Sequence, residues 1–226
     1  MKLNRIMLLI CLISLVTTHS AYADCSDRRK PGMDWSGCKK ANKILDEQNF
    51  TGSRFDDAIL TSSVLDESNF TRASLVKADF TRASFVGSLF VNADMTKSVG
   101  YRANFNRATL TNTSMTKSEF FRAGFENAII SDVDWSRAEL GRVDFTEAKL
   151  KNVSFEFSNL SRVTFKQTSI DNVDFRMAYT YRTHFEGTDL RKAVNLGQIQ
   201  VEMACGNAAT RLPEGMWQPD SWPCSE

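Results

Sequence analysis

The sequence is poor in proline, in histidine and in surplus charge of either sign. Its 226 residues include four Pro and two His, and 28 Lys plus Arg stand against 27 Asp plus Glu. A net charge of +1 argues against both a strongly basic nucleic-acid binder and a strongly acidic DNA mimic. The scarcity of His disfavours most histidine-dependent catalysis. The prolines all lie outside residues 48–192, so nothing there interrupts a continuous backbone ladder: they are Pro31, Pro213, Pro219 and Pro223.

The first 23 residues have the pattern of a secretory signal peptide. Two basic residues precede the apolar run Ile6–Val16, and Ala21-Tyr22-Ala23 supplies small residues for cleavage before Asp24. A transmembrane anchor needs roughly 17–25 apolar residues, which this run does not reach. A lipoprotein is a lesser alternative because Cys25 lies close by, although its surroundings do not form a lipobox. We expect a periplasmic or secreted protein with no transmembrane segment after cleavage.

Cleavage would leave four cysteines and a formal charge of −1. An even number of cysteines in an exported chain indicates disulfides, for which three pairings are possible. Their positions favour Cys25–Cys38 and Cys205–Cys224, since each pair lies near one end of the sequence. The spacing does not suit zinc. No Cys-x-x-Cys motif is present, so a redox-active pair is disfavoured.

Large apolar residues recur at every fifth position from Phe50 to Leu190. Of these 29 positions, only Gly100 and Thr180 depart from the pattern, and 14 of the 16 Phe lie on it. A small residue (Ala, Ser, Thr or Val) stands two positions before 28 of the 29. The phase never slips, so the pattern indicates one repeated structural unit.

A period of five fits neither an α-helix nor a straight strand. Five helical residues advance about 500°, which would scatter the large residues around the whole surface. In a straight strand an odd spacing would place them alternately on opposite faces. A chain that turns a corner every five residues instead points each small and each large residue inward. We therefore expect an all-β coil whose remaining positions face solvent or form the corners.

The outward residues indicate how many sides this coil has. Arginine recurs at intervals of 20 residues, at Arg82, Arg102, Arg122, Arg142, Arg162 and Arg182. An Asn series with the same period suits corners, because Asn tolerates left-handed backbone and hydrogen-bonds its own turn. A 20-residue period with a corner every five residues predicts a four-sided coil. The 29 repeats predict about seven coils spaced about 4.8 Å apart.

Several of these repeats resemble a known family. Ala78-Asp79-Phe80-Thr81-Arg82 and Ala103-Asn104-Phe105-Asn106-Arg107 are similar to the A(D/N)Lxx unit of pentapeptide-repeat proteins. The resemblance implies a right-handed quadrilateral β-helix, a pentapeptide-repeat solenoid. It implies little about activity, since most members have no assigned function. The flanks, residues 31–38 and 204–224, look like those of exported bacterial members.

The pattern divides the chain into four parts. Residues 1–23 are the signal peptide, 24–47 an N-terminal cap, 48–192 the β-helix and 193–226 a C-terminal cap. The caps are needed because an open coil exposes unpaired backbone and core Phe. Gln198–Cys205 is expected to form a short helix stopped by Gly206. Each predicted disulfide would hold one cap.

The arginine series, which we call the arginine stripe, is the best candidate for an interaction surface. A basic row with interleaved aromatic residues suits an anionic ligand that also stacks, such as a glycan or polyanion. The candidate binding residues are Tyr101, Arg102, Phe121, Arg122, Arg142, Tyr181 and Arg182. Gly100 leaves the core thin beneath Tyr101, so that ring either points outward or turns inward to fill the space.

A structural role for the stripe is the competing interpretation. Three carboxylates precede an arginine by three residues, which would suit ion pairing. The pairs would be Asp79 with Arg82, Glu119 with Arg122 and Glu139 with Arg142.

The sequence offers no constellation for catalysis. His184 has no nucleophile placed beside it, acidic residues are spread over all sides, and no phosphate loop is present. We therefore expect no enzyme, no metal site and no cofactor.

The leading hypothesis is an exported β-helical scaffold that binds an unknown protein or an anionic envelope polymer. One alternative comes from the resembling family, in which some members mimic DNA and act on DNA gyrase. Export and a charge of −1 disfavour it, and nucleic acid itself is an improbable partner. The other is a β-helical enzyme acting on polysaccharides, which a groove with clustered carboxylates would indicate.

Overall fold

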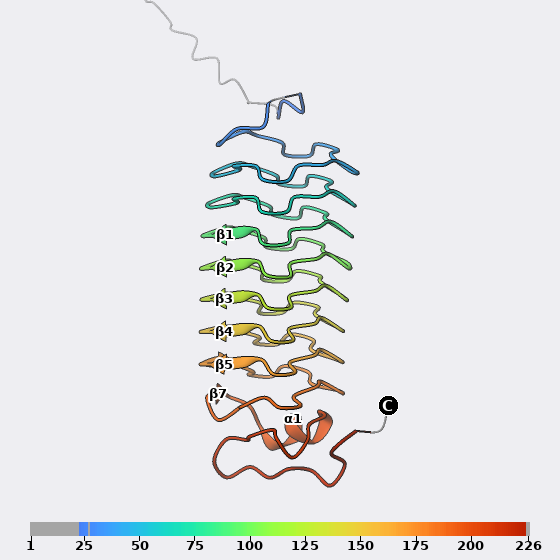
Figure 1. Ribbon diagram of the computed structural model, residues 1–226, viewed down its shortest axis with the longest axis vertical. Coiled ribbons are helices and arrows are strands. Elements are labelled where there is room, and N and C mark those ends of the chain that lie inside the picture. The colour runs from blue at the N-terminus through green and yellow to red at the C-terminus, as the bar shows by residue number, and fades with distance from the viewer. Residues whose placement is uncertain (1–22, 27, 225–226) are drawn as a thin grey trace, which may run out of the picture.

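The computed structural model describes residues 23–26 and 28–224, which wind into a rod of stacked coils (Figure 1). The predicted signal peptide lies outside them apart from Ala23. Five strands form a parallel sheet in the order β1-β2-β3-β4-β5, and each pairs with the strand 20 residues later. They are β1 (Leu89–Val91), β2 (Thr109–Thr111), β3 (Ile129–Ser131), β4 (Lys149–Lys151) and β5 (Ser169–Asp171). The predicted 20-residue period is confirmed.

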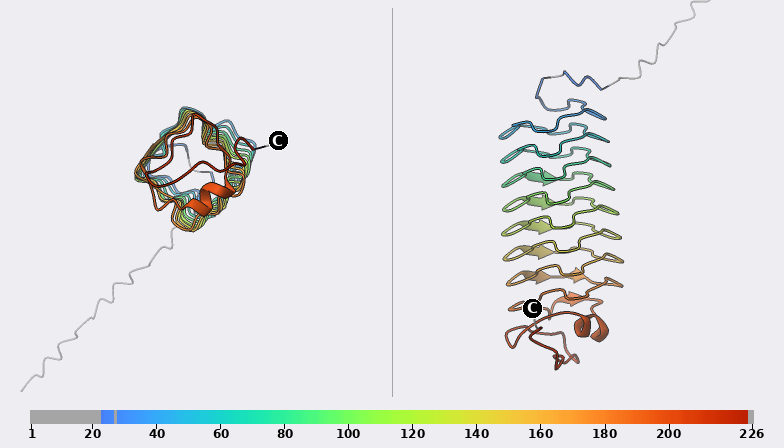
Figure 2. Two further views of the ribbon diagram at one scale, coloured as in Figure 1. Left: turned by 90° about the horizontal axis from the view of Figure 1, so that it is seen from below. Right: turned by 90° about the vertical axis from the view of Figure 1, so that its right-hand side faces the viewer.

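Single bridges extend this register to the other sides of the coil. Asp34 pairs with Arg54, and β6 (Val173–Asp174) pairs with β7 (Ala193–Val194). Seen along the axis, the coils superpose in a four-cornered outline (Figure 2). The chain is therefore a quadrilateral β-helix, as the corner argument predicted.

The β-helix begins earlier than the sequence pattern suggested. Residues 31–47, assigned above to the N-terminal cap, already follow the coil, and the Trp35 N–H donates to the carbonyl of Arg54 at 2.8 Å. Pairings from Asp34 to Val194 span eight coils of 20 residues, not about seven. The boundary was wrong because polar residues interrupt the inward series of the first coil. They are Lys40, Lys43 and Gln48.

Each corner contains a residue with left-handed backbone, two positions after the large core residue. The φ angle is 56° at Arg102 and 66° at Gly52. For a non-glycine residue this conformation costs roughly 1–2 kcal/mol. The ladder offsets this cost, because corner N–H groups donate along the rod axis. The Arg102 N–H, for example, donates to the Phe121 carbonyl at 3.0 Å.

The Asn series lies at one such corner, as predicted, but its side chains bond differently. The amide of Asn152 donates to Asp132 and that of Asn172 to Asn152, both at 2.9 Å. These bonds join neighbouring coils instead of closing the residue's own turn. The expected bond to the local turn was wrong, because the Asn or Asp side chain at the same corner one coil away is within hydrogen-bonding distance.

Phenylalanine rings fill the lumen of the rod. Six of them, one per coil, form a continuous stack with adjacent centroids 4.8–5.4 Å apart. They are Phe85, Phe105, Phe125, Phe145, Phe165 and Phe185, all fully buried. The inward register deduced from the five-residue period is confirmed.

Gly100, the first break in the core pattern, makes room for a ring from the next coil. A Cβ atom at Gly100 would lie 2.4 Å from the Phe120 ring, and Phe120 reaches across to Phe80 at a centroid separation of 5.8 Å. Phe120 therefore occupies the space that Gly100 leaves. Tyr101 points outward and remains 41% exposed.

We expect Gly100→Ala to lower the free energy of unfolding by about 1–3 kcal/mol, because the new methyl group would displace a fully buried ring. Thermal or chemical denaturation measures this loss. Adding Phe120→Leu to the same chain should recover part of it, since the smaller side chain makes room. If Gly100→Ala were as stable as the parent, the Phe120 ring would be able to shift without cost, and the prediction would be wrong.

Thr180, the second break, meets the C-terminal cap. Its hydroxyl donates to the Gln200 carbonyl at 2.8 Å, within the helix α1 (Gln198–Met203) that lies near the C-terminal end of the rod in Figure 1. The Gln200 side chain in turn donates to the carbonyls of Phe175 and Ala178. Thr180 is polar because the helix offers it a backbone carbonyl. The predicted short helix is present, but it ends at Met203 with Ala204 as its C-cap, before Cys205 and Gly206.

Both predicted disulfides are present. Cys25 bonds to Cys38 and Cys205 to Cys224, with Cα atoms 5.5 and 5.4 Å apart. At the C-terminal end, the Trp222 indole donates to the Ala204 carbonyl at 2.7 Å. Among residues 23–26 and 28–224, no helix is long and apolar enough to cross a membrane.

Candidate functional site

Tyr101 and Phe121 form an aromatic pair on the outside of the rod. They occupy equivalent positions on adjacent coils, and their rings stack with centroids 5.1 Å apart and planes 21° from parallel. Gly141 takes the same position on the next coil, and a Cβ atom there would lie only 3.0 Å from the Phe121 ring. The absence of a side chain at Gly141 lets Phe121 lie along the surface.

Three arginines of the stripe lie over these rings. The guanidinium carbons of Arg102 and Arg122 are 6.0 and 5.4 Å from the centroids of Tyr101 and Phe121. The guanidinium carbon of Arg142 also lies 6.0 Å from the Phe121 centroid. Cation–π contacts at exposed sites contribute about 0.5–1 kcal/mol each, enough to bias side-chain orientation.

The predicted ion pairs with carboxylates are not formed. Within the described residues, no salt bridge involves Arg82, Arg122 or Arg142. Glu139 instead accepts a hydrogen bond from the Asn159 amide at 2.8 Å, and Asp79 accepts one from the Thr81 N–H at 2.9 Å. These two carboxylates bond along the axis or within their own turn, whereas Arg122 and Arg142 lie over the Phe121 ring.

Tyr181 does not join the aromatic pair. It lies several coils away, where it is stacked on Tyr179 at a centroid distance of 6.2 Å. The seven candidate residues therefore separate into two groups. Tyr101, Arg102, Phe121, Arg122 and Arg142 form one cluster, while Tyr181 and Arg182 lie near the C-terminal cap.

A basic groove of about 580 Å³ continues the stripe toward that cap. Arg142, Arg162 and Arg182 line one side of it, and Lys166 and His184 are also part of the lining. The sequence interpretation included neither Lys166 nor His184. The signal that could have found them is spacing, since both lie within four residues of a stripe arginine.

One carboxylate also lines this groove. The Glu186 Oε1 atom lies 2.9 Å from His184 Nδ1, while Oε2 is buried without a hydrogen-bond partner among the described residues. The groove thus combines three Arg side chains and one Lys side chain with one His–Glu pair. Such a lining suits binding of an anion.

Apolar side chains are exposed at the C-terminal end, on a surface that the sequence pattern missed. A cavity of about 820 Å³ there is lined by Met177, Tyr179 and Ile199, among others. Met177 and Ile199 are 70% and 73% exposed. Exposed apolar patches of this kind are common where proteins make contacts.

The described residues contain no group of three or more His, Cys, Asp or Glu side chains that could hold a metal ion. The His184 ring is hydrogen-bonded to the Glu186 carboxylate at 2.9 Å, and His184 pairs through its backbone with Thr164 and Cys205 on the adjacent coils.

Comparison with known proteins agrees with the repeat pattern. The model of the pentapeptide repeat region matches residues 83–175 and 118–196, and a second model, for eight copies of the repeat, matches 49–87. The chain belongs to the pentapeptide-repeat family. No curated protein matches it.

Solved pentapeptide-repeat proteins share the fold. A trypsin-treated variant of QnrB1, a plasmid-mediated fluoroquinolone resistance protein, is 16% identical with a TM-score of 0.56, over 81% of this chain and 91% of that one. HetL, involved in heterocyst differentiation regulation in the cyanobacterium Nostoc, is 18% identical with a TM-score of 0.48. That match covers 85% of this chain and 92% of HetL. At 16% identity the likeness to QnrB1 concerns the fold alone.

Proposed function

We propose that this pentapeptide-repeat protein is an exported, non-enzymatic scaffold that binds an anionic partner through the arginine stripe. Export rests on the sequence of residues 1–23, with cleavage before Asp24 and release into the periplasm or medium. The partner is an acidic envelope glycan or a protein with an acidic surface, which would present the same chemistry to the stripe.

The observation that carries this proposal is the stacking of arginines on the Tyr101–Phe121 pair. Each guanidinium group lies over a ring, so its N–H edge remains available to carboxylate, sulfate or phosphate. Because the rings restrict the arginine side chains, less rotamer entropy is lost when a ligand binds. The half-exposed Tyr101 ring also offers a face on which a sugar could stack.

The two alternatives have less support. A gyrase-directed DNA mimic needs an acidic face, whereas six arginines follow one corner of this rod and the chain after cleavage has a formal charge of −1. A glycan-cleaving enzyme needs a pair of carboxylates, whereas the groove beside the stripe is lined by Arg, Lys and His with Glu186 as its carboxylate.

The double variant Arg102→Ser with Arg122→Ser tests the stripe. On immobilised heparin, an anionic glycan, we expect it to elute at clearly lower salt than the parent protein, because two charge-assisted contacts are lost. Stability should change by less than about 1 kcal/mol, since exposed charges contribute little to it.

The matched control is Arg72→Ser with Arg107→Ser. Both residues are exposed and have the same left-handed backbone, with φ of 58° and 60°, but they lie at other corners. The control variant should elute from immobilised heparin at the same salt concentration as the parent protein. If both double variants lost heparin retention equally, the loss would depend on net charge alone, and this would contradict the proposal.

N-terminal sequencing of protein recovered outside the cytoplasm tests export.

A further inference from the structure

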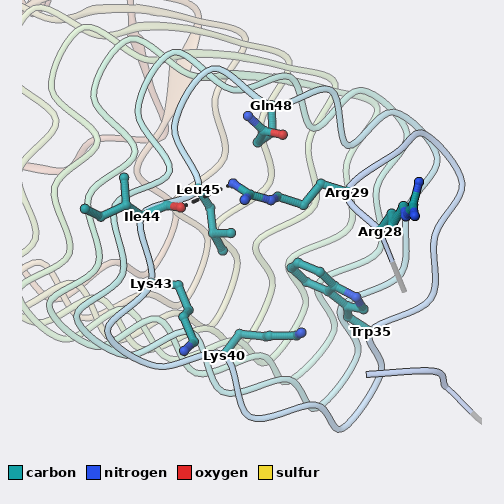
Figure 3. A pocket seen from close by; sticks show the side chains of 8 residues that line it. All are labelled: Arg28, Arg29, Trp35, Lys40, Lys43, Ile44, Leu45 and Gln48. Atoms are coloured by element: carbon teal, nitrogen blue, oxygen red, sulfur yellow. Dashed lines mark hydrogen bonds between the residues drawn. The ribbon is translucent and has the colours of Figure 1, made fainter. Parts of the chain in front are cut away.

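A second basic cavity opens at the opposite, N-terminal end of the rod. Its volume is about 590 Å³, and Figure 3 shows basic side chains around an apolar floor. The basic residues are Arg28, Arg29, Lys40 and Lys43, and the floor includes Trp35 and Leu45. Within the described part of the chain, no carboxylate lines it. We call this the end cavity.

The coil register explains why lysines are present there. Lys40 occupies a position that holds Phe or Leu in most later coils, and Lys43 one that holds a small residue. The fold therefore directs both side chains toward the axial opening. The Lys40 ammonium lies 4.0 Å from the centroid of the Trp35 ring and donates to the Cys25 carbonyl at 2.5 Å.

Arg29 crosses the opening. Its guanidinium donates to the backbone carbonyl of Ile44 at 3.4 Å, a bond drawn as a dashed line in Figure 3. Ile44 contributes this carbonyl, while its side chain, like that of Lys39, is at an outward position. Leu45 and Trp35 are buried beneath the charged groups and close the inner end of the opening.

The positive charges at this end repel one another. Burial above all, followed by the charge of Lys43, lowers the pKa of Lys40; Arg29 adds to this and Asp24 opposes it. An anion placed among these groups would relieve the repulsion. A bare inorganic ion would leave most of the volume to water and would not contact the apolar floor.

We propose that the end cavity binds a small amphiphilic anion, a carboxylate or phosphate ester with a short apolar body. Lys40, Lys43 and Arg29 would hold the anionic group. Trp35 and Leu45 would contact the apolar body. This site shares no residue with the arginine stripe. Its test therefore does not depend on the function proposed above.

Calorimetric titration of the exported protein with octanoate tests the proposal. We expect saturable binding at one site, no binding of 1-octanol, and inorganic phosphate at least tenfold weaker than octanoate. Octanol binding as tightly as octanoate would refute the role of the cations. Phosphate binding as tightly would refute the role of the apolar floor.

Lys43→Gln and Lys39→Gln form a matched pair of variants. Both residues are exposed and lie in the same coil, but Lys39 is at an outward position that pairs with Ile59. We expect Lys43→Gln to weaken octanoate binding about tenfold, as for loss of one charge-assisted bond, and Lys39→Gln less than twofold. Equal effects, or no effect of Lys43→Gln, would overturn the site. Melting temperatures of both variants should match the parent.

Discussion

Phe145→Ala is expected to lower the free energy of unfolding by about 3–5 kcal/mol. The ring is fully buried and stacks on Phe125 and Phe165, with centroids 5.3 and 5.2 Å away. Its removal would leave a cavity that the coils above and below cannot fill without shifting. Because each coil packs only on its neighbours, the damage should extend along the rod. Chemical denaturation monitored by circular dichroism measures the loss.

Lys149→Ala is the control for this experiment. Lys149 begins β4 and points outward, so its loss should change stability by no more than about 0.5 kcal/mol. Similar unfolding free energies for the Phe145 and Lys149 variants would contradict the inward register of the five-residue repeat.

Cys224→Ser is expected to cost about 3 kcal/mol, because the Cys205–Cys224 bridge restrains a loop of 19 residues in the unfolded chain. The native consequence should be local. Amide hydrogen exchange is expected to become faster in α1 and around Ala204, because the Ala204 carbonyl accepts the hydrogen bond of the Trp222 indole in the parent protein. Amides in β1 to β3 should stay protected.

Cys25→Ser is the corresponding change at the other end. It should quicken exchange around the first coil, near Trp35, and leave α1 unchanged. If both variants loosened the same end, the two bridges could not act as independent clamps. A non-reducing peptide map that joined Cys25 to Cys224 would contradict the observed pairing outright.

The repeat allowed much of the fold to be predicted. Phe85, Phe105 and Phe125 could be placed in the core, and on one side of it, from their spacing alone. This works because every coil gives its residues the same surroundings, so a position in the sequence corresponds to one position in space. The same reasoning placed Tyr101 and Phe121 on one side of adjacent coils, but it left open whether the Tyr101 ring points outward or inward.

The arrangement of polar side chains within the candidate site could not be predicted in this way. Glu139 lies three residues before Arg142, yet it bonds to Asn159 on the next coil. A stacked coil gives every side chain neighbours 20 residues away, and these compete with neighbours in the local sequence. Spacing shows which groups are within reach, whereas packing decides which of them bond.

The sequence by itself determined the four-sided coil, the inward register and the position of the stripe, because these depend on a pattern that each coil repeats. Only the tertiary structure decided the ends. There Lys40 and Lys43 take inward positions, Thr180 meets α1, and Cys224 comes to line the basic groove with His184. At an end a coil has a neighbour on one side alone, so periodicity no longer specifies the contacts and residues distant in sequence supply them.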